Sequence, residues 1–411
     1  VLYSTFLGGS KPEGIRIIIP LDDDEFIFIG GTRSPDFPIA GTPWDSTFRG
    51  DTSSIYATMV FVTRFDLSSN QIISSTYFGG SDLDGIASAV YHDGQIVFAG
   101  STWSDDLPVS PNAWQPQHRG NGDGYIAALD STGSELIFCS YIGGSGIENL
   151  WDMQIDAAGN IVITGLTDSW NYPTTQGVVQ SRYGGGEDDI FVTKFNHDVS
   201  ELLFSTYIGG SGWDEGRSLR FTPDGNILVA GYTNSDNFPV TKDALYNRRA
   251  AFDEGCVFIL TPGGRRLVYS TYIAWDTHED ARAAYIDDDG VMTVFGLTTS
   301  TDLPVNEVSF QKQKGDYPAL NPTIPDFYVL KYLLDTGDIL ACTYLGGSGK
   351  ELYPNELIPL RDGSVLICGS GNSDDYPLTE GIHNSVPNIY SAFISYLDSD
   401  LSELYMSVII G

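Results

Sequence analysis

Positively charged residues are scarce in this sequence. Only 21 Lys and Arg stand against 54 Asp and Glu, which gives a formal net charge of −33. Proteins that bind nucleic acid need clustered Lys and Arg to replace the counterions of the phosphate backbone. The composition therefore argues against a nucleic-acid partner. Strong negative charge favours solubility and cation binding, but it does not specify a ligand.

Cysteine and long apolar runs are also scarce. The four cysteines lie in separate apolar segments of different repeats, so we expect buried thiols and no disulfide: Cys139, Cys256, Cys342 and Cys368. No apolar run approaches the roughly 18 residues that span a bilayer, and no signal peptide is visible. We therefore expect no membrane insertion. Since Val1 stands inside a repeat, we interpret the chain as a processed product or a part of a longer protein.

Motifs of the common enzyme classes are missing. The sequence has no Gly-x-Ser-x-Gly, His-Glu-x-x-His, Walker loop or Cys-x-x-Cys, so no nucleophile, zinc or phosphate motif stands out. It also lacks any helical stripe longer than about two turns at the 3.6-residue period. These absences predict an all-β protein and favour a role other than catalysis.

One repeated unit accounts for most of what is present. Its most regular copy lies at residues 203–239 and contains the string Gly-x-Thr-x-Ser-x-Asn-aromatic-Pro. Related strings are 65 to 73 residues apart and end at Pro38, Pro108, Pro173, Pro239, Pro304 and Pro377. A period of this length indicates a repeat architecture.

Each repeat has the pattern of four strands, named A to D here. In residues 203–273, SLRFT and NILVAGYT flank an Asp-Gly turn, and CVFILT and RLVYSTYI flank a Pro-Gly-Gly turn. Alternating runs split by such turns predict β-hairpins. Four antiparallel strands per repeat predict a propeller blade. The alternative, a stacked solenoid, would use shorter repeats of one to three strands.

The stretches STYIGGSGWDEGRSLRFTPDGNILVAGYTNSDNFP and GGGEDDIFVTKF resemble the bacterial β-propeller repeats called SBBP, which are distantly similar to NHL-type repeats. The resemblance covers essentially the whole chain. It implies a β-propeller and, because such repeats occur in bacterial envelope and secreted proteins, an extracellular or cell-surface location. It implies no catalytic residues.

We predict a single domain over residues 1–411, an all-β, six-bladed β-propeller of four-stranded antiparallel blades. Seven blades, which the family's name implies, is the alternative. Residues 1–8 and 403–410 both have the pattern of strand D, so we expect an outer-type strand at each terminus. These two strands would compete for the edge of the last blade, or one would lead into a missing neighbour.

Strand polarity predicts two different ends of each blade. The A–B and C–D turns share one end, and the D–A loops and long B–C segments share the other, which we call the loop face. We expect all seven tryptophans on the loop face: Trp44, Trp103, Trp114, Trp151, Trp170, Trp213 and Trp275. Exposed Trp suits carbohydrate stacking or a protein hot spot. The alternative is that these rings fill the wedges between blades.

Acidic residues follow the D–A loop of every repeat. Our candidates for a cation site are Asp214, Glu215, Glu279 and Asp280. A rim of carboxylates at a channel mouth supplies the oxygen ligands that Ca²⁺ prefers. The alternative is that these carboxylates accept backbone N–H bonds between blades, helped by arginines in matching register: Arg16, Arg217 and Arg282.

The serines of the repeated string are interpreted as scaffold, because chemistry needs one asymmetric site. We expect them to bond locally to the backbone and set a turn. They are Ser34, Ser104, Ser169, Ser235, Ser300 and Ser373.

The fifth repeat departs most from the others. Its leading loop, AWDTHED, replaces Gly-Gly-Ser and introduces Trp275 and His278, and its B–C segment contains Tyr317. His278 with its acidic neighbours suits a transition metal or a general base; the alternative is a solvated loop. The candidate ligand-binding residues are Trp103, Trp170, Trp213, Trp275, His278 and Tyr317.

These patterns predict a non-catalytic binding or structural module of a larger bacterial protein. Its partner would be a glycan or protein held at the loop face, or neighbouring domains of the same chain, and no cofactor is required apart from a potential Ca²⁺. Two alternatives stay open. One is a polysaccharide-acting enzyme that uses paired carboxylates at the channel mouth, and the other is a calcium-stabilised adhesin domain.

Overall fold

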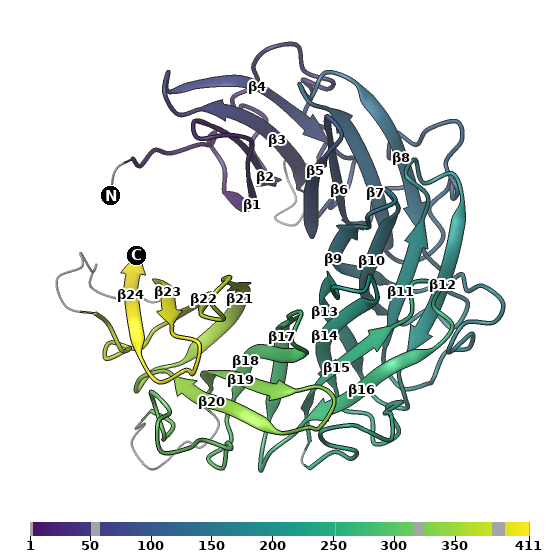
Figure 1. Cartoon of the computed structure of the whole chain (residues 1–411). Helices are drawn as coiled ribbons and strands as arrows, with labels where there is room; N and C mark the ends of the chain where they lie inside the picture. The colour runs from purple at the N-terminus through teal and green to yellow at the C-terminus, as the bar shows by residue number, and fades with distance from the viewer. Residues whose placement is uncertain (1–2, 51–57, 251, 316–323, 380–390, 411) are drawn as a thin grey trace. The chain divides into compact units, whose positions relative to one another are not determined.

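The computed structural model describes residues 3–50, 58–250, 252–315, 324–379 and 391–410. Within these ranges the chain contains 24 β-strands and no helix, and hence no helix long and apolar enough to cross a membrane. Tyr317 lies outside the described residues. The strands form six four-stranded sheets in which neighbours follow one another in chain order (Figure 1). The predicted fold class, a six-bladed β-propeller of A-B-C-D blades, is therefore confirmed.

The chain separates into two compact units, residues 1–183 with 190–207, and residues 184–189 with 208–411. The first unit holds blades one to three. Their strands are β1 (Glu13–Pro20), β2 (Glu25–Thr32), β3 (Met59–Asp66), β4 (Gln71–Phe78), β5 (Ser88–His92), β6 (Gln95–Thr102), β7 (Asp123–Asp130), β8 (Leu136–Ile142), β9 (Glu148–Ile155), β10 (Ile161–Thr167), β11 (Asp189–Phe195) and β12 (Leu202–Ile208). The prediction of a single domain stays a prediction.

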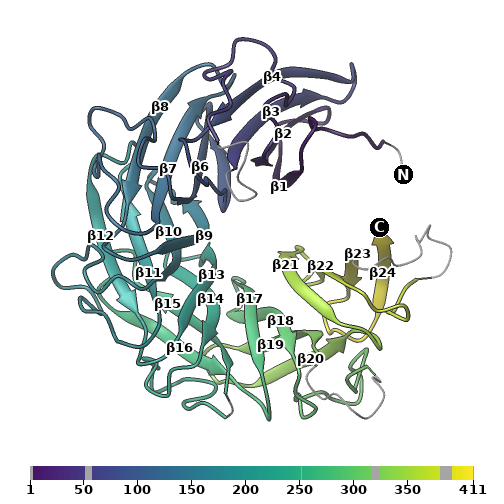
Figure 2. The same cartoon turned by 180° about the vertical axis from the view of Figure 1, so that it is seen from behind.

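The second unit holds blades four to six, which Figure 2 shows from the opposite side. Their strands are β13 (Asp214–Phe221), β14 (Ile227–Thr233), β15 (Glu254–Leu260), β16 (Leu267–Ile273), β17 (Glu279–Ile286), β18 (Val291–Thr298), β19 (Asp326–Leu333), β20 (Ile339–Leu345), β21 (Glu351–Pro359), β22 (Val365–Gly371), β23 (Ser391–Leu397) and β24 (Leu404–Ile410).

The apolar core lies between successive blades rather than at one centre. One buried cluster joins blades one and two, and a second joins blades two and three. In the second unit, one cluster joins blades four and five and another joins blades five and six. Strands B and C of blades two to five are buried along nearly their whole length, which explains why their sequences are mostly apolar.

Strand A carries a β-bulge near its start in several blades. In β13 the register with β14 shifts between Gly216 and Ser218, so Arg217 is the extra residue. The bulge brings the backbone of strand A so close to Gly231 that a Cβ there would lie 2.0 Å from the carbonyl oxygen of Glu215. The glycine of the repeated string is therefore required by this close approach.

The B–C segments cover the outer edges of the blades. In blade four the segment after β14 bonds to strand β16, where Thr241 N–H donates to Ser270 O at 3.0 Å and Tyr272 N–H donates to Tyr246 O at 3.1 Å. Corresponding bonds tie the segments of the other described blades to β4, β8, β12, β20 and β24. An uncovered edge strand can pair with another chain. The B–C segments cover the edges of strand D and so prevent such pairing.

The same segments correct the prediction of one loop face. Trp44 N–H donates to Gly133 O at 2.9 Å and Trp114 N–H donates to Val199 O at 3.1 Å. Gly133 and Val199 lie in C–D turns of the following blades, so both tryptophans lie near the end opposite the D–A loops. The B–C segments run the length of the outer strand instead of staying at one end. Strand polarity fixes where a segment starts and ends, but not the path between.

Two sequence expectations concern the termini and the thiols. Leu404–Ile410 form β24, the fourth strand of blade six, whereas residues 3–8 are described without strand structure. The expected strand at the N-terminus is therefore absent over residues 3–8, and β24 takes the edge of β23. All four cysteines are free. Cys139, Cys256 and Cys342 are buried, as expected, whereas Cys368 is only partly buried.

Candidate functional site

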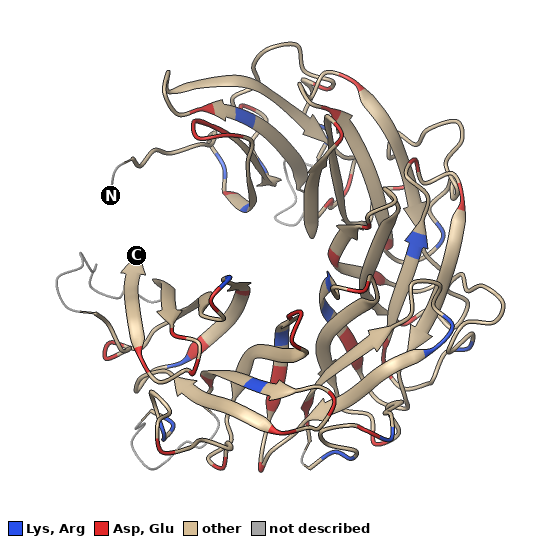
Figure 3. Cartoon of the chain, viewed as in Figure 1, with Lys and Arg blue, Asp and Glu red and all other residues tan. Residues whose placement is uncertain are grey.

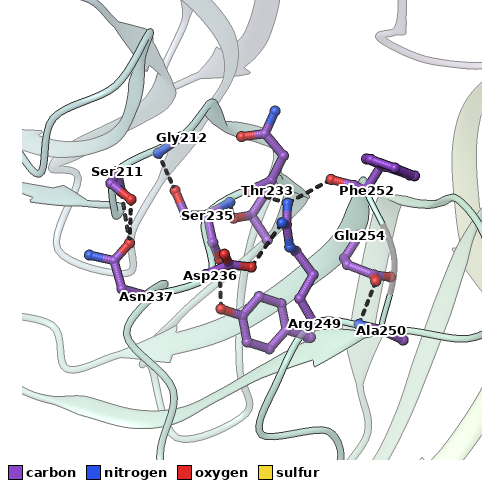
Figure 4. A network of polar contacts seen from close by, with 12 residues as sticks. Ser211, Gly212, Thr233, Ser235, Asp236, Asn237, Arg249, Ala250, Phe252 and Glu254 are labelled. Atoms are coloured by element: carbon purple, nitrogen blue, oxygen red, sulfur yellow. Dashed lines mark hydrogen bonds and ion pairs between the residues drawn. The ribbon is translucent and has the colours of Figure 1, made fainter.

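The serines of the repeated string are buried in all six blades. Each follows strand B and forms hydrogen bonds that hold the open end of the A–B hairpin in place. Ser235 Oγ accepts a hydrogen bond from Gly212 N at 2.7 Å (Figure 4). It also donates to Asp214 Oδ2 at 2.8 Å. Its carbonyl accepts the hydroxyl of Tyr272 at 2.8 Å. These partners belong to the D–A loop, strand A and strand D. The expected local turn is present as well, because the Ser235 carbonyl also accepts Phe238 N–H at 3.4 Å. The scaffold interpretation itself agrees with this geometry.

The acidic residue at the start of strand A accepts further hydrogen bonds in the same network. Besides Ser235, Asp214 accepts the N–H of Gly210 at 2.7 Å and the hydroxyl of Thr233. Glu279 likewise accepts from Trp275 N at 2.9 Å and from Thr298 at 3.0 Å. These carboxylates are buried and use their oxygens on the protein itself, which is the alternative considered for them.

The next residue of strand A makes a different contact. Glu215 pairs with Arg217 at 2.6 Å, and Asp280 pairs with Arg282 at 2.5 Å. Burial, more than any other cause, raises the pKa of Glu215, while the charge of Arg217 lowers it. Among the described residues no group of three or more His, Cys, Asp or Glu is arranged to hold a metal ion. The four cation candidates therefore do not form one site.

The tryptophans are mostly buried between other groups. Trp275 is 6% exposed and packs edge-on against Tyr328 at 5.1 Å between ring centroids. Trp103 is partly buried, and a Cβ on Gly122 would lie 2.9 Å from its ring. Trp170, in the first unit, is 72% exposed. A ring that is covered cannot offer its plane to a sugar, so Trp170 keeps that capacity and Trp275 does not.

The structure brings two of the candidate residues together in the second unit. Trp213 packs edge-on against Tyr232 at 5.5 Å between centroids, and His278 lies 6.1 Å from the same tyrosine. Asp253 joins them, because it accepts the Tyr232 hydroxyl at 2.5 Å and lies 3.4 Å from His278 Nδ1. We call Trp213, Tyr232, Asp253 and His278 the Tyr232 cluster. All four side chains are partly buried.

Sequence analysis missed Tyr232 and Asp253. A signal existed for Tyr232, because the middle residue of its Gly-x-Thr string is aromatic in no other repeat. Burial raises the pKa of the Tyr232 hydroxyl, followed by its bond to Asp253 and the negative charges around it. The phenol therefore stays protonated and serves as a hydrogen-bond donor. The cluster thus offers fixed polar groups around an aromatic ring.

A cleft of about 690 Å³ lies beside this cluster, between the B–C segment of blade four and the loop that leads into blade five. Its lining includes Tyr246, the exposed Arg248, and two exposed carboxylates, Asp276 and Asp302. Burial and the charge of Asp276 raise the pKa of Asp302. One wall is therefore cationic and the opposite wall anionic.

Arg249 holds the cleft segment in place. Its guanidinium donates to Phe252 O at 2.7 Å and to Asn234 O, and it pairs with Asp236 at 2.8 Å (Figure 4). Phe252, the residue at the end of this segment, is 87% exposed. Phe252 therefore presents an apolar ring to solvent two residues beyond Ala250, which lines the cleft.

Basic side chains are few on every blade, as Figure 3 shows. The segment that lines the cleft carries two of them in succession, Arg248 and Arg249. With 21 basic residues in 411, such a pair at a cleft is unusual for this chain. The junction of blades four and five is therefore our candidate functional site.

Comparison with known proteins identifies the repeat but not the ligand. Solved structures with distant similarity include BamB from Moraxella catarrhalis (10% identity, TM-score 0.38, 97% of this chain and 90% of that chain). Another is a protein of unknown function from Dyadobacter fermentans (11% identity, TM-score 0.41, 94% and 96%). No curated protein matches the sequence significantly. Residues 203–239 match the family model of the SBBP β-propeller repeat, and this chain is accordingly a β-propeller that carries an SBBP repeat.

Proposed function

We propose that the chain is a non-catalytic binding module of a bacterial cell-surface or secreted protein, and that it recognises a protein ligand at the junction of blades four and five. The observation that carries this proposal is the cleft beside Phe252. The cleft occurs where the repeat departs from its own pattern, and a departure from a repeat is where an asymmetric site can form.

A polypeptide fits the cleft better than a glycan does. Arg248 on one wall and Asp276 with Asp302 on the other complement a segment that carries both signs of charge. Phe252 offers an apolar anchor of the kind that dominates protein interfaces. Trp275, the aromatic that sugar stacking would use here, is covered.

An enzymatic role on polysaccharide has less support. Such chemistry needs two carboxyl groups that a sugar chain can reach. The strand A carboxylates expected at a channel mouth are buried, and Asp214, Glu279 and Glu351 are each 0% exposed.

The proposal is tested by selecting peptides from a displayed random library against the immobilised protein. We expect enriched peptides whose affinity falls roughly 30-fold for Phe252→Ala, the loss expected for a hot-spot anchor. Arg248→Ala should weaken binding and make it less sensitive to salt. Both side chains are exposed, so neither change should alter thermal stability.

Trp170→Ala is the matched control, because it removes an exposed aromatic from the other unit. Its peptide affinity should equal that of the wild type. Selected peptides that bind Phe252→Ala and Arg248→Ala as tightly as the wild type would contradict the proposal. Binding of a glycan from an array, lost in Trp170→Ala and retained in Phe252→Ala, would contradict it as well.

A further inference from the structure

Pairs of buried carboxyl groups lie at the junctions between blades. One member opens strand C of a blade and the other opens strand A of the next. In the second unit Asp326 of β19 meets Glu351 of β21, and Glu254 of β15 meets Glu279 of β17. All four are at most 1% exposed. The pair of Asp326 and Glu351 lies outside the lining of the proposed ligand site.

The pair of Asp326 and Glu351 shows the geometry most clearly. One oxygen of each carboxyl group accepts a hydrogen bond. Asp326 Oδ2 accepts one from Gly315 N at 2.7 Å, and Glu351 Oε1 accepts one from the Ser373 hydroxyl. The other two oxygens face each other around Gly346, at 2.7 Å and 2.8 Å from the point that a Cβ on this glycine would occupy. These two atoms, Asp326 Oδ1 and Glu351 Oε2, are buried and have no other hydrogen-bond partner among the described residues.

A hydrogen bond between two carboxyl groups requires a proton, because two ionised carboxylates present only acceptors. A proton shared between Asp326 Oδ1 and Glu351 Oε2 would give both of these buried oxygens a hydrogen-bond partner. Burial, and after it the negative charge of Asp326, raises the pKa of Glu351, which favours such a proton.

Two further pairs approach each other around a glycine, although facing oxygens in them also accept backbone N–H bonds, Glu148 Oε2 from Gly144 and Asp214 Oδ2 from Gly210. In the first unit a Cβ on Gly143 would lie 2.4 Å from Glu148 Oε2 and 2.5 Å from Asp123 Oδ1. In the second unit Gly209 lies in the same way between Asp189 and Asp214. A glycine at this point lets the two acids approach, which explains the first glycine of the Gly-Gly-Ser loop in these repeats.

We propose that each of these carboxyl pairs shares one proton. The shared proton stabilises the contact between successive blades at neutral pH, and its removal destabilises that contact. Ionising both members would place two like charges a few ångströms apart in a dry junction, which strongly disfavours the closed state.

The charged groups around the pairs act in both directions. Lys314 lowers and Asp375 raises the pKa of Asp326, and His118 and Arg119 both lower the pKa of Asp123. Burial is the first cause at every pair, and it raises the pKa of Glu351 to about 9, of Asp189 to about 8 and of Glu148 to about 7. The proton belongs to each pair rather than to one residue.

The direction of the pH effect follows from linkage. Because the folded state raises these pKa values above those of the unfolded chain, it holds protons that the unfolded chain has already lost. The stabilisation is complete below about pH 4, declines as the pH rises above that value, and is fully lost once the pH has passed the folded values, about 7 to 9. Stability should therefore fall continuously from weakly acidic pH to about pH 9.

Glu351→Gln tests the proposal, because glutamine keeps the shape and donates an amide hydrogen to Asp326 without titrating. We expect the melting temperature of the wild type to fall from pH 6 to pH 9 and that of Glu351→Gln to fall less. Glu13→Gln is the matched control at the same repeat position, where the carboxylate is partly exposed and opens the first blade. Its pH profile should follow that of the wild type.

Infrared difference spectroscopy keeps the proposal testable if the variant folds poorly. The wild type at pH 7 should show the carbonyl band of protonated carboxylic acids in the folded state, and this band should disappear by pH 10. A melting temperature that does not change between pH 6 and pH 9, or a missing band, would overturn the proposal. So would a stabilisation by Ca²⁺ that is reversed by chelator and lost in Glu351→Gln, because a cation would then occupy the place of the proton.

Discussion

At the residue scale, close backbone approach decides which positions tolerate change. Gly231 and Gly31 both lie in strand B of their blades, within the same string of the repeat. Only Gly231 faces a bulge, whereas a Cβ on Gly31 would meet nothing within 4 Å. Two glycines one position apart in the repeat thus have opposite requirements.

We expect Gly231→Ala to lower the free energy of unfolding by about 1–3 kcal/mol, because the new methyl overlaps the carbonyl of Glu215 and the hairpin must shift. Gly31→Ala, its matched control, should leave stability unchanged or raise it by up to about 1 kcal/mol through the lower entropy of the unfolded chain. Denaturant unfolding of both variants measures the difference. Equal effects of the two substitutions would show that the bulge does not constrain Gly231.

At the scale of elements, the strands follow from sequence but the connections do not. Turn residues such as Asp224-Gly225, where Gly225 has φ of 78°, set each hairpin locally, so strands A to D could be placed in all six repeats. The B–C segments fold back along strand D through long-range bonds that no local pattern announces. The Tyr232 cluster was missed for the same reason, because its four residues come from four segments that are separate in the sequence.

Removing the Arg249 side chain should make the B–C segment of blade four more mobile without unfolding the blade. Arg249→Ala deletes the bonds to Asn234, Phe252 and Asp236, so we expect faster amide exchange at Tyr272 and protease cleavage near residues 244–253, with little change in melting temperature. Arg248→Ala is the control, since this neighbouring side chain is exposed. Similar exchange rates in both variants would show that Arg249 does not hold the segment.

At the scale of the whole molecule, the charge imbalance acts against folding. With a formal net charge of −33, the compact chain repels itself more than the extended chain does. Raising NaCl from roughly 0.02 M to roughly 0.3 M shortens the screening length from about 20 Å to below 10 Å. We expect the melting temperature at pH 7 to rise over this range. A flat or falling profile would mean that local ion pairs such as Glu25 with Arg64 outweigh the general repulsion.

The hydrogen bonds that recur in every repeat around the buried serine have a consequence for how repeats can be added to such a chain. Ser235, Asp214 and the loop that they hold all belong to one repeat, and the junction acids recur at the same two positions in successive repeats. A gene segment that encodes one repeat therefore also encodes the hydrogen bonds that hold its own D–A loop and the acids that meet those of the neighbouring blades. Duplication or exchange of repeats would keep these acid pairs, except beside blades one and six, where Met59 and Ser391 occupy the strand C position of the acid.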